Sequence, residues 1–224
     1  MLESFKTLDK KAEYEIVEKK SRFIANASPV ESENEANEFI NKIKKKYRDA
    51  RHNVFAYQIG QNNEIIKQSD DGEPSGTAGL PVLDVLRGAN IKNAAIVVTR
   101  YFGGVLLGTG GLVRAYGKSA KGAVENAVIV EKTLLREIEI NADYSLLGKL
   151  QYETERMGHI IKNIDYTDTI LISVLTKEKN AENFIEFITD ITKGQAKAKK
   201  LGQSYYKLNK LKHTLWLNIF LKTL

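Results

Sequence analysis

Three carboxylates and one glycine-rich loop are the parts of this 224-residue chain whose types and spacing could do chemistry. Asp70, Asp71 and Glu73 stand within one short acidic turn, where their oxygens could hold Mg²⁺ or one of them could act as a base. The alternative is structural, because acidic side chains in turns often accept hydrogen bonds from backbone amides. We keep both interpretations and predict no metal and no cofactor, Mg²⁺ being the one ion this turn could accept.

The second group is a set of glycines between a buried-looking strand and a helix. Ten of the 16 glycines lie between Gln68 and Lys121. A glycine loop that leads into a helix offers unpaired N–H groups and the positive end of the helix dipole to an anion. Loop geometry without any ligand is the alternative explanation. The candidate anion or nucleic-acid site comprises Arg100, Tyr101, Phe102, Gly103, Gly104, Gly108, Gly110, Gly111, Arg114, Lys118 and Lys121.

The side chains of this group suit a phosphate polymer. Arg100 and Arg114 could donate bidentate hydrogen bonds to phosphates. Tyr101 and Phe102 could stack on bases if they are exposed, or they could be core residues. Both possibilities depend on positions that the sequence does not fix.

Common phosphate-enzyme motifs are absent from the loop. A Walker A loop has four residues between its two glycines, but five separate Gly111 from Gly117. A dinucleotide fingerprint starting at Gly108 would need a glycine in place of Val113, and a nucleophile elbow would need one in place of Lys121. The three histidines are scattered, so we predict neither a zinc site nor a histidine-dependent triad.

The elements that must position these residues follow from hydrophobic periodicity. A capping box of Ser32 and Glu35 predicts a helix with an apolar face, and the acidic turn is expected to enter a second helix capped by Ser75 or Thr77. The remaining elements of this first part are strands at 14–18, 22–28, 54–59, 64–67 and 94–99 and a helix at 111–128.

The pattern then restarts near residue 130. It predicts a strand at 136–141, a helix at 144–157, strands at 160–166 and 169–175, a helix capped at Asn180, and a strand at 195–206. This order is typical of a ferredoxin-like unit. We therefore predict an α+β protein with domains at 1–132 and 133–206, joined without a flexible linker. Residues 207–224 could be an extra docking helix, a partner-binding segment or an altered reading frame, and we favour the helix.

Charge and composition limit the class of protein. The net charge is +6, and the segment after residue 190 carries eight lysines and no acid. A second basic run lies at 42–51. Such clusters favour phosphate backbones, although for either basic run taken alone a solvated helix face or tail is the preferred explanation. The chain has no cysteine, no apolar signal segment at its start and no stretch long enough to span a membrane, so we expect a cytoplasmic protein.

Two long motifs carry a resemblance to a known family. DDGEPSGTAGLPVLDVL at 70–86 and VVTRYFGGVLLGTGGLVRAYGKSA at 97–120 resemble the signature of the IMPACT family, YigZ/YvyE type. The resemblance implies an N-terminal domain with a ribosomal-protein domain-2-like fold, as in domain IV of elongation factor G. It also implies a small ferredoxin-like domain, as in domain V of that factor.

Two functions remain from different classes. The first, favoured by the resemblance, is a non-enzymatic protein that binds RNA, the ribosome or a translation factor and regulates translation. A protein partner is kept open as well. The second is an enzyme that acts on a phosphorylated small molecule, with the glycine loop holding the phosphate and Asp70, Asp71 or Glu73 as metal ligand or base.

Overall fold

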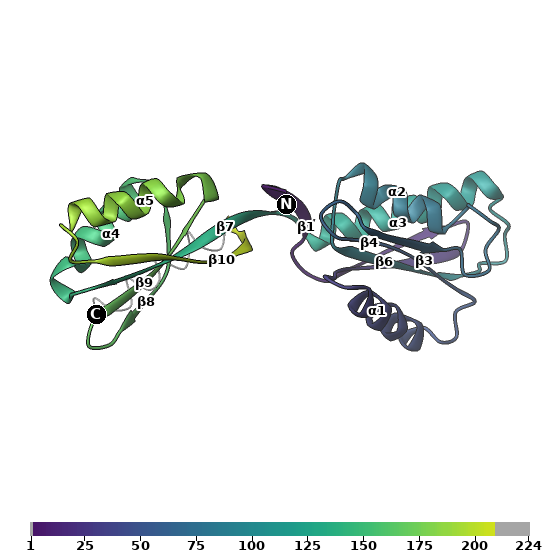
Figure 1. Ribbon diagram of the computed structural model, residues 1–224. Coiled ribbons are helices and arrows are strands. Elements are labelled where there is room, and N and C mark those ends of the chain that lie inside the picture. Colours follow the sequence, from purple (N-terminus) through teal and green to yellow (C-terminus); the bar gives the residue numbers. More distant parts are fainter. Residues whose placement is uncertain (1, 209–224) are drawn as a thin grey trace. The chain divides into compact units, whose positions relative to one another are not determined.

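The computed structural model describes residues 2–208 and divides into two compact units, Met1–Glu131 and Lys132–Leu224 (Figure 1). Each unit contains helices packed on a sheet, so the prediction of a mixed α+β protein is confirmed. The three explanations offered for the tail at 207–224 concern residues that lie, from 209 on, outside the described part of the chain.

The sheet of the first unit has the strand order β2-β3-β6-β4-β5, and neighbouring strands are antiparallel. A strand at Ser4–Leu8 (β1) was not predicted. The other elements are β2 (Ala12–Glu18), β3 (Ser21–Pro29), α1 (Glu33–Lys46), β4 (His52–Ile59), β5 (Ile65–Ser69), α2 (Gly79–Gly88), β6 (Ala94–Tyr101) and α3 (Thr109–Ala127).

Helices cover both faces of this sheet (Figure 1). The central strand β6 is buried on both sides, which explains its continuous apolar sequence. Ile96 and Val98 face a core shared with α2 and α3, whereas Ala95 and Val97 face a core shared with α1. Because α3 packs on the sheet that contains β6, the position of α3 relative to the end of β6 is fixed.

Close packing of α3 on the sheet explains one helical glycine and not another. A side-chain carbon at Gly122 would lie 2.1 Å from Cδ1 of Tyr14, so only glycine fits there. A carbon added at Gly117 would meet no atom within 4 Å. Packing on the sheet therefore explains the glycine at Gly122 and does not account for Gly117.

The second unit comprises β7 (Ile129–Ala142), which begins just before the boundary, a short 3₁₀ turn (Tyr144–Leu146), α4 (Leu147–Arg156), β8 (Ile160–Tyr166), β9 (Ile170–Thr176), α5 (Glu178–Ile191) and β10 (Lys197–Lys207). Four strands run in the order β10-β7-β9-β8, and α4 and α5 pack on one face (Figure 1). This strand order and connectivity are those of a ferredoxin-like unit.

Two predicted helix caps are wrong. Helix α2 begins at Gly79, and its N-cap is Ala78, because the hydroxyl of Thr77 bonds to the carbonyl of Pro74 instead. Helix α5 begins at Glu178 with Lys177 as the N-cap, three residues before the predicted Asn180. The predicted cap of α1 is confirmed: Oγ of Ser32 accepts from the amide of Glu35.

Candidate nucleic-acid interface

Asp70 serves as the missing cap of α2. Its two carboxylate oxygens accept hydrogen bonds from the amides of Gly76 (2.9 Å), Ala78 (3.0 Å) and Gly79 (2.8 Å). Burial alone would raise the pKa of Asp70, but these three backbone donors outweigh it, and the pKa lies below its ordinary value. The residue therefore orders the turn that precedes α2.

Asp71 joins two other elements to the same turn. One carboxylate oxygen accepts from Nζ of Lys44 on α1 at 2.9 Å, and the other accepts from the amide of Asn53 on β4 at 2.7 Å. Its carbonyl oxygen lies 2.9 Å from Nδ1 of His52. One of the basic residues predicted to favour phosphates is thus already neutralised by the protein itself.

Glu73 is at the centre of a buried polar network. Its Oε1 accepts from Nη1 of Arg100 at 2.7 Å and from the hydroxyl of Tyr116 at 2.7 Å. The Arg100 and Glu73 side chains are only 8% and 4% exposed. Burial, reinforced by the charge of Glu73, raises the pKa of Tyr116 far above its ordinary value. The network holds the acidic turn, β6 and α3 together.

These hydrogen bonds support the structural interpretation of the acidic turn. All three carboxylates have partners within the protein. Within residues 2–208, no three histidine or acidic side chains gather as a metal site. The structure does bring the acidic turn and Arg100 together, but as a buried support, so Arg100 does not lie on the surface where we expected it.

Beyond β6, the chain forms a loop that is held tightly at its start. The amide of Gly103 donates to Oγ of Ser21 at 3.1 Å, and a side-chain carbon at Gly103 would lie 2.0 Å from the carbonyl carbon of Lys20. This contact fixes the loop against the β2–β3 hairpin. Apolar side chains nevertheless face water on either side of it: Phe102 is 53% exposed and Leu106 is 83% exposed.

The backbone at the start of α3 is open. Gly104 and Gly108 have φ angles of 83° and 69°, and a carbon added at either would meet no atom within 4 Å. Gly108 is the N-cap of α3 and supplies no side-chain cap. The first amides of a helix have no partner within the helix, so this end of α3 presents donors to a ligand.

A hollow of about 260 Å³ adjoins this helix end. Lys19, Arg114 and Lys118 bring three cations to it, against the single carboxylate of Glu18, and the remaining lining residues are Leu107, Gly111 and Ala115. Among the described residues, none of the three cations forms an ion pair. We call the loop at 102–108, the first three turns of α3 and Lys19 the loop–helix surface.

The other predicted site residues differ in how free their side chains are to contact a ligand. Lys121 lies on α3 with its side chain 72% exposed and Nζ 3.9 Å from Glu125. The hydroxyl of Tyr101 donates to Asp49 at 2.8 Å, and the guanidinium of Arg22 lies 5.7 Å from its ring centre. Tyr101 is therefore engaged within the protein, while Phe102 is more than half exposed.

Sequence reasoning missed Lys19 and misplaced Arg100. Lys19 is in the β2–β3 turn, and only the fold places it beside α3. Arg100 could have been placed correctly, because Ile96, Val98 and Arg100 lie two residues apart on one strand and share a face. An arginine on a core-facing position requires a buried partner.

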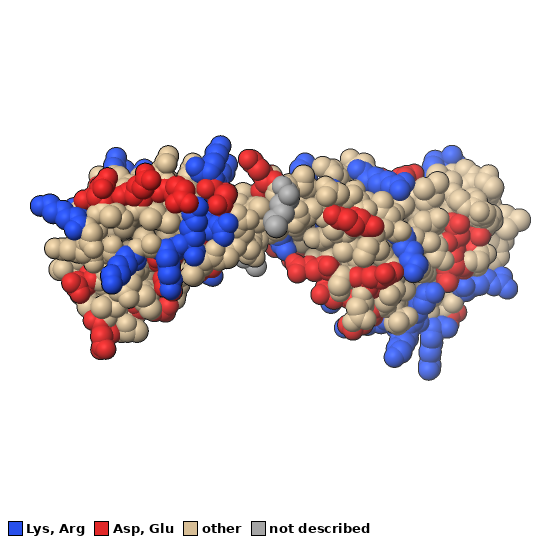
Figure 2. All heavy atoms as spheres, viewed as in Figure 1, with Lys and Arg blue, Asp and Glu red and all other residues tan. Residues whose placement is uncertain are grey.

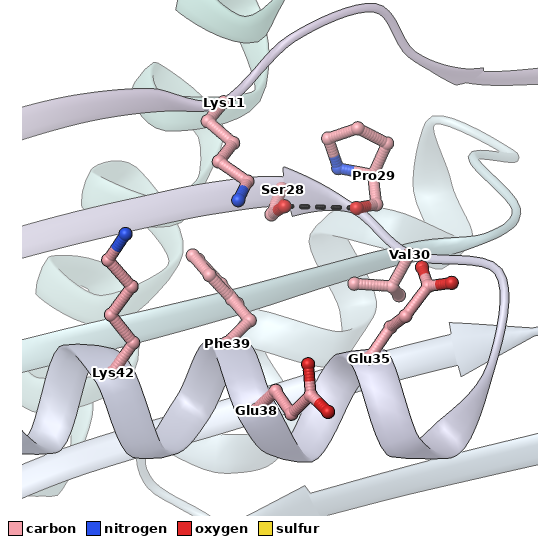
Figure 3. Close-up of a pocket in the computed structure, with 8 residues that line it drawn as sticks. All are labelled: Lys11, Ser28, Pro29, Val30, Glu35, Glu38, Phe39 and Lys42. Carbon is pink, nitrogen blue, oxygen red and sulfur yellow. Dashed lines mark hydrogen bonds between the residues drawn. The ribbon is translucent and has the colours of Figure 1, made fainter.

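A second hollow of about 200 Å³ lies between α1 and the β2–β3 hairpin. Figure 3 shows Lys11 and Lys42 reaching toward the space beside Phe39 from the two sides. Two carboxylates, Glu35 and Glu38, line the same hollow. Because its charges balance, it favours a polyanion less than the loop–helix surface does.

On the face that Figure 2 shows, charge does not single out a binding patch. In Figure 2, lysine and arginine side chains are interspersed with aspartate and glutamate over the visible face. No helix within the described part of the chain is long and apolar enough to cross a membrane. A local excess of cations is a better guide to a nucleic-acid-binding site than the distribution of charge over the whole face. The loop–helix surface has such an excess.

Known proteins share both parts of this chain. Residues 19–124 match the family model described as the Impact N-terminal domain, and residues 140–195 match a domain of unknown function, DUF1949. The IMPACT family member YvyE of Bacillus subtilis (strain 168) is 44% identical over 216 residues, which cover 96% of this chain and 100% of that protein.

A second relative and a solved structure agree. The IMPACT family member YigZ of Escherichia coli (strain K12) is 34% identical over 178 residues, which cover 79% of this chain and 87% of that protein. A solved chain described as the crystal structure of an hypothetical protein has 31% identity and a TM-score of 0.60, and the match covers 90% of this chain and 99% of that one. The resemblance seen in the two motifs is thereby confirmed: the chain belongs to the IMPACT family.

Proposed function

We propose that this protein binds nucleic acid, and that the loop–helix surface of its first unit contacts the phosphate backbone. The observation that carries the proposal is the hollow beside α3, where Lys19, Arg114 and Lys118 form no ion pair among residues 2–208 and outnumber the one carboxylate of the lining, Glu18. Cations held in this way release the counterions of a phosphate chain when they bind it, and that release drives association.

The open backbone adds to this attraction. The first amides of α3 could donate hydrogen bonds to a phosphate oxygen, and the bare glycines before the helix would let it approach the backbone closely. Arg114 lies near that end, since its Nη1 is 3.6 Å from where a side-chain carbon of Gly110 would be. A guanidinium and helix amides together suit an anion such as a phosphate.

The partner we propose is RNA, in the context of the ribosome or a translation factor. Family membership supports this through the likeness it implies to the last two domains of elongation factor G. Under this proposal the protein regulates translation by contact with RNA rather than by chemical change. The internal use of Asp70, Asp71 and Glu73 fits a binding protein, since these carboxylates are committed to the fold.

Fluorescence anisotropy with a labelled RNA hairpin that carries a single-stranded tail tests this proposal. The variant Arg114→Ala/Lys118→Ala is compared with Lys11→Ala/Lys42→Ala, which removes two cations from the other hollow of the same unit. Loss of two phosphate contacts should reduce the magnitude of the slope of log affinity against log salt by about 1.4 to 1.8.

The control variant, Lys11→Ala/Lys42→Ala, has the same net charge as Arg114→Ala/Lys118→Ala. It should keep the salt slope of the wild-type protein. Equal losses in both double variants would mean that only net charge matters, and the loop–helix surface would then not be the site. Absence of binding by the wild-type protein at low salt would refute the function itself.

A further inference from the structure

We propose that the loop–helix surface selects single-stranded over double-stranded nucleic acid, because one unpaired base stacks on the open face of Phe102. This inference rests on the proposed function and adds the class of nucleic acid to it. It starts from an aromatic ring that is 53% exposed although it directly follows a buried strand.

The ring of Phe102 is supported from within the protein. The guanidinium of Arg100 lies over it, 5.7 Å from the ring centre, and that guanidinium is held by Glu73. The neighbouring Gly103 is fixed to the hairpin through Ser21. Because one face is braced and the backbone is held on both sides, the ring is a preorganised platform whose other face meets solvent.

A preorganised aromatic platform favours unpaired bases for a physical reason. In a duplex the faces of the bases are buried in the stack, so an external ring gains nothing from them. In a single strand each base can leave its neighbours and stack on a side chain, which contributes about 1–3 kcal/mol per base. The exposed ring is therefore of use only to a strand that is not paired.

The chain runs from the platform to the cationic hollow within a few residues. The loop that begins at Phe102 reaches Leu107, which lines the hollow, as does Gly111 in the first turn of α3. Leu106, which precedes Leu107 in the loop, is 83% exposed and adds apolar area. A strand with a base on Phe102 could thus direct its adjoining phosphates toward Arg114 and Lys118.

An exposed phenylalanine and leucine near cations also suit an anionic membrane surface. The bracing of Phe102 by Arg100 favours a base, because insertion into lipid needs no oriented ring. Anionic vesicles therefore belong in the experiment as a competing ligand.

Three labelled probes test the inference: a short A-rich RNA, the same strand annealed to its complement, and vesicles that contain phosphatidylserine. The wild-type protein is compared with Phe102→Leu, which keeps apolar bulk without a ring, and with Phe102→Tyr, which keeps the ring. Because Phe102 is exposed, the variants should fold, and circular dichroism checks this.

We expect the wild-type protein to bind the single strand about tenfold or more tightly than the duplex. Phe102→Leu should weaken single-strand binding about fivefold or more, as loss of one stacked base implies, and should leave the salt slope and duplex binding unchanged. Phe102→Tyr should bind the single strand as the wild-type protein does. The readout therefore separates a stacking loss from a charge loss.

Two results would overturn the inference while the proposed function stands: equal affinity for single strand and duplex, or a Phe102→Leu variant that binds the single strand as tightly as the wild-type protein. Binding to vesicles but to neither RNA would overturn both and identify a membrane surface. Failure to bind any probe would also overturn both.

Discussion

Replacing Glu73 with alanine should strongly destabilise the first unit. The substitution leaves the guanidinium of Arg100 charged in a site where its side chain is 8% exposed. Within residues 2–208 its Nε has no hydrogen-bond partner, so the guanidinium is incompletely satisfied even before Glu73 is removed. The hydroxyl of Tyr116 loses its acceptor in the same step.

The cost can be worked out from these contacts. Removal of one member of a buried ion pair typically costs about 3–5 kcal/mol, because it leaves an unpaired buried charge. Loss of the Tyr116 hydrogen bond alone is worth about 1 kcal/mol, which Tyr116→Phe measures separately. Since native proteins are stable by only about 5–15 kcal/mol, Glu73→Ala should remove a large part of the stability of this unit.

Urea unfolding followed by circular dichroism measures these differences. The double variant Glu73→Met/Arg100→Met removes both charges and should be more stable than Glu73→Ala, because no buried charge is left unpaired. If Glu73→Ala instead unfolds within about 1 kcal/mol of the wild-type protein, the network is not a buried support. The acidic turn would then have to be reconsidered as a ligand site.

Three further predictions concern other parts of the chain. Burial lowers the pKa of His159 below its ordinary value of 6.5. The stability that the neutral ring contributes is therefore present above about pH 6.5 and is lost on acidification, because the unfolded state takes up a proton more readily than the folded state. His159→Gln should flatten the dependence of the unfolding free energy on pH between about pH 7 and pH 5. Gly103→Ala should lower the melting temperature, because its new carbon meets the backbone of Lys20, whereas Gly117→Ala, which meets nothing, should stabilise α3 by about 0.5–1 kcal/mol. Asp70→Asn should cost about 1–3 kcal/mol of unfolding free energy near neutral pH. It should also weaken the loss of stability in acid, because the lowered pKa of Asp70 gives stability that is present above about pH 3.8 and is lost as pH falls through the folded value. Urea midpoints measured from about pH 5 to pH 2 check this.

Much of the fold could be predicted because its signals are local. The alternation of apolar residues identified most of the strands, and the capping box of Ser32 and Glu35 marked the start of α1. Element order was enough to suggest the ferredoxin-like arrangement of the second unit. These signals depend on residues that are close together in the sequence, so they can be recognised without knowledge of the fold.

The site was harder to predict because its contacts join distant segments. Asp70 caps a helix whose N-cap is eight residues further on, and Glu73 meets partners 27 and 43 residues away. Spacing rules do not reach such separations. The density of special residues correctly marked a region that assembles in space, but it did not show which residues turn inward and which face water.

The buried network around Glu73 also has an evolutionary consequence. Folding depends on residues that are enclosed, whereas Arg114, Lys118 and Phe102 project from solvent-facing turns. Selection for a new partner can therefore alter the outer positions without endangering the architecture. A chain divided in this way could diversify its ligands across lineages while each descendant inherits the same scaffold.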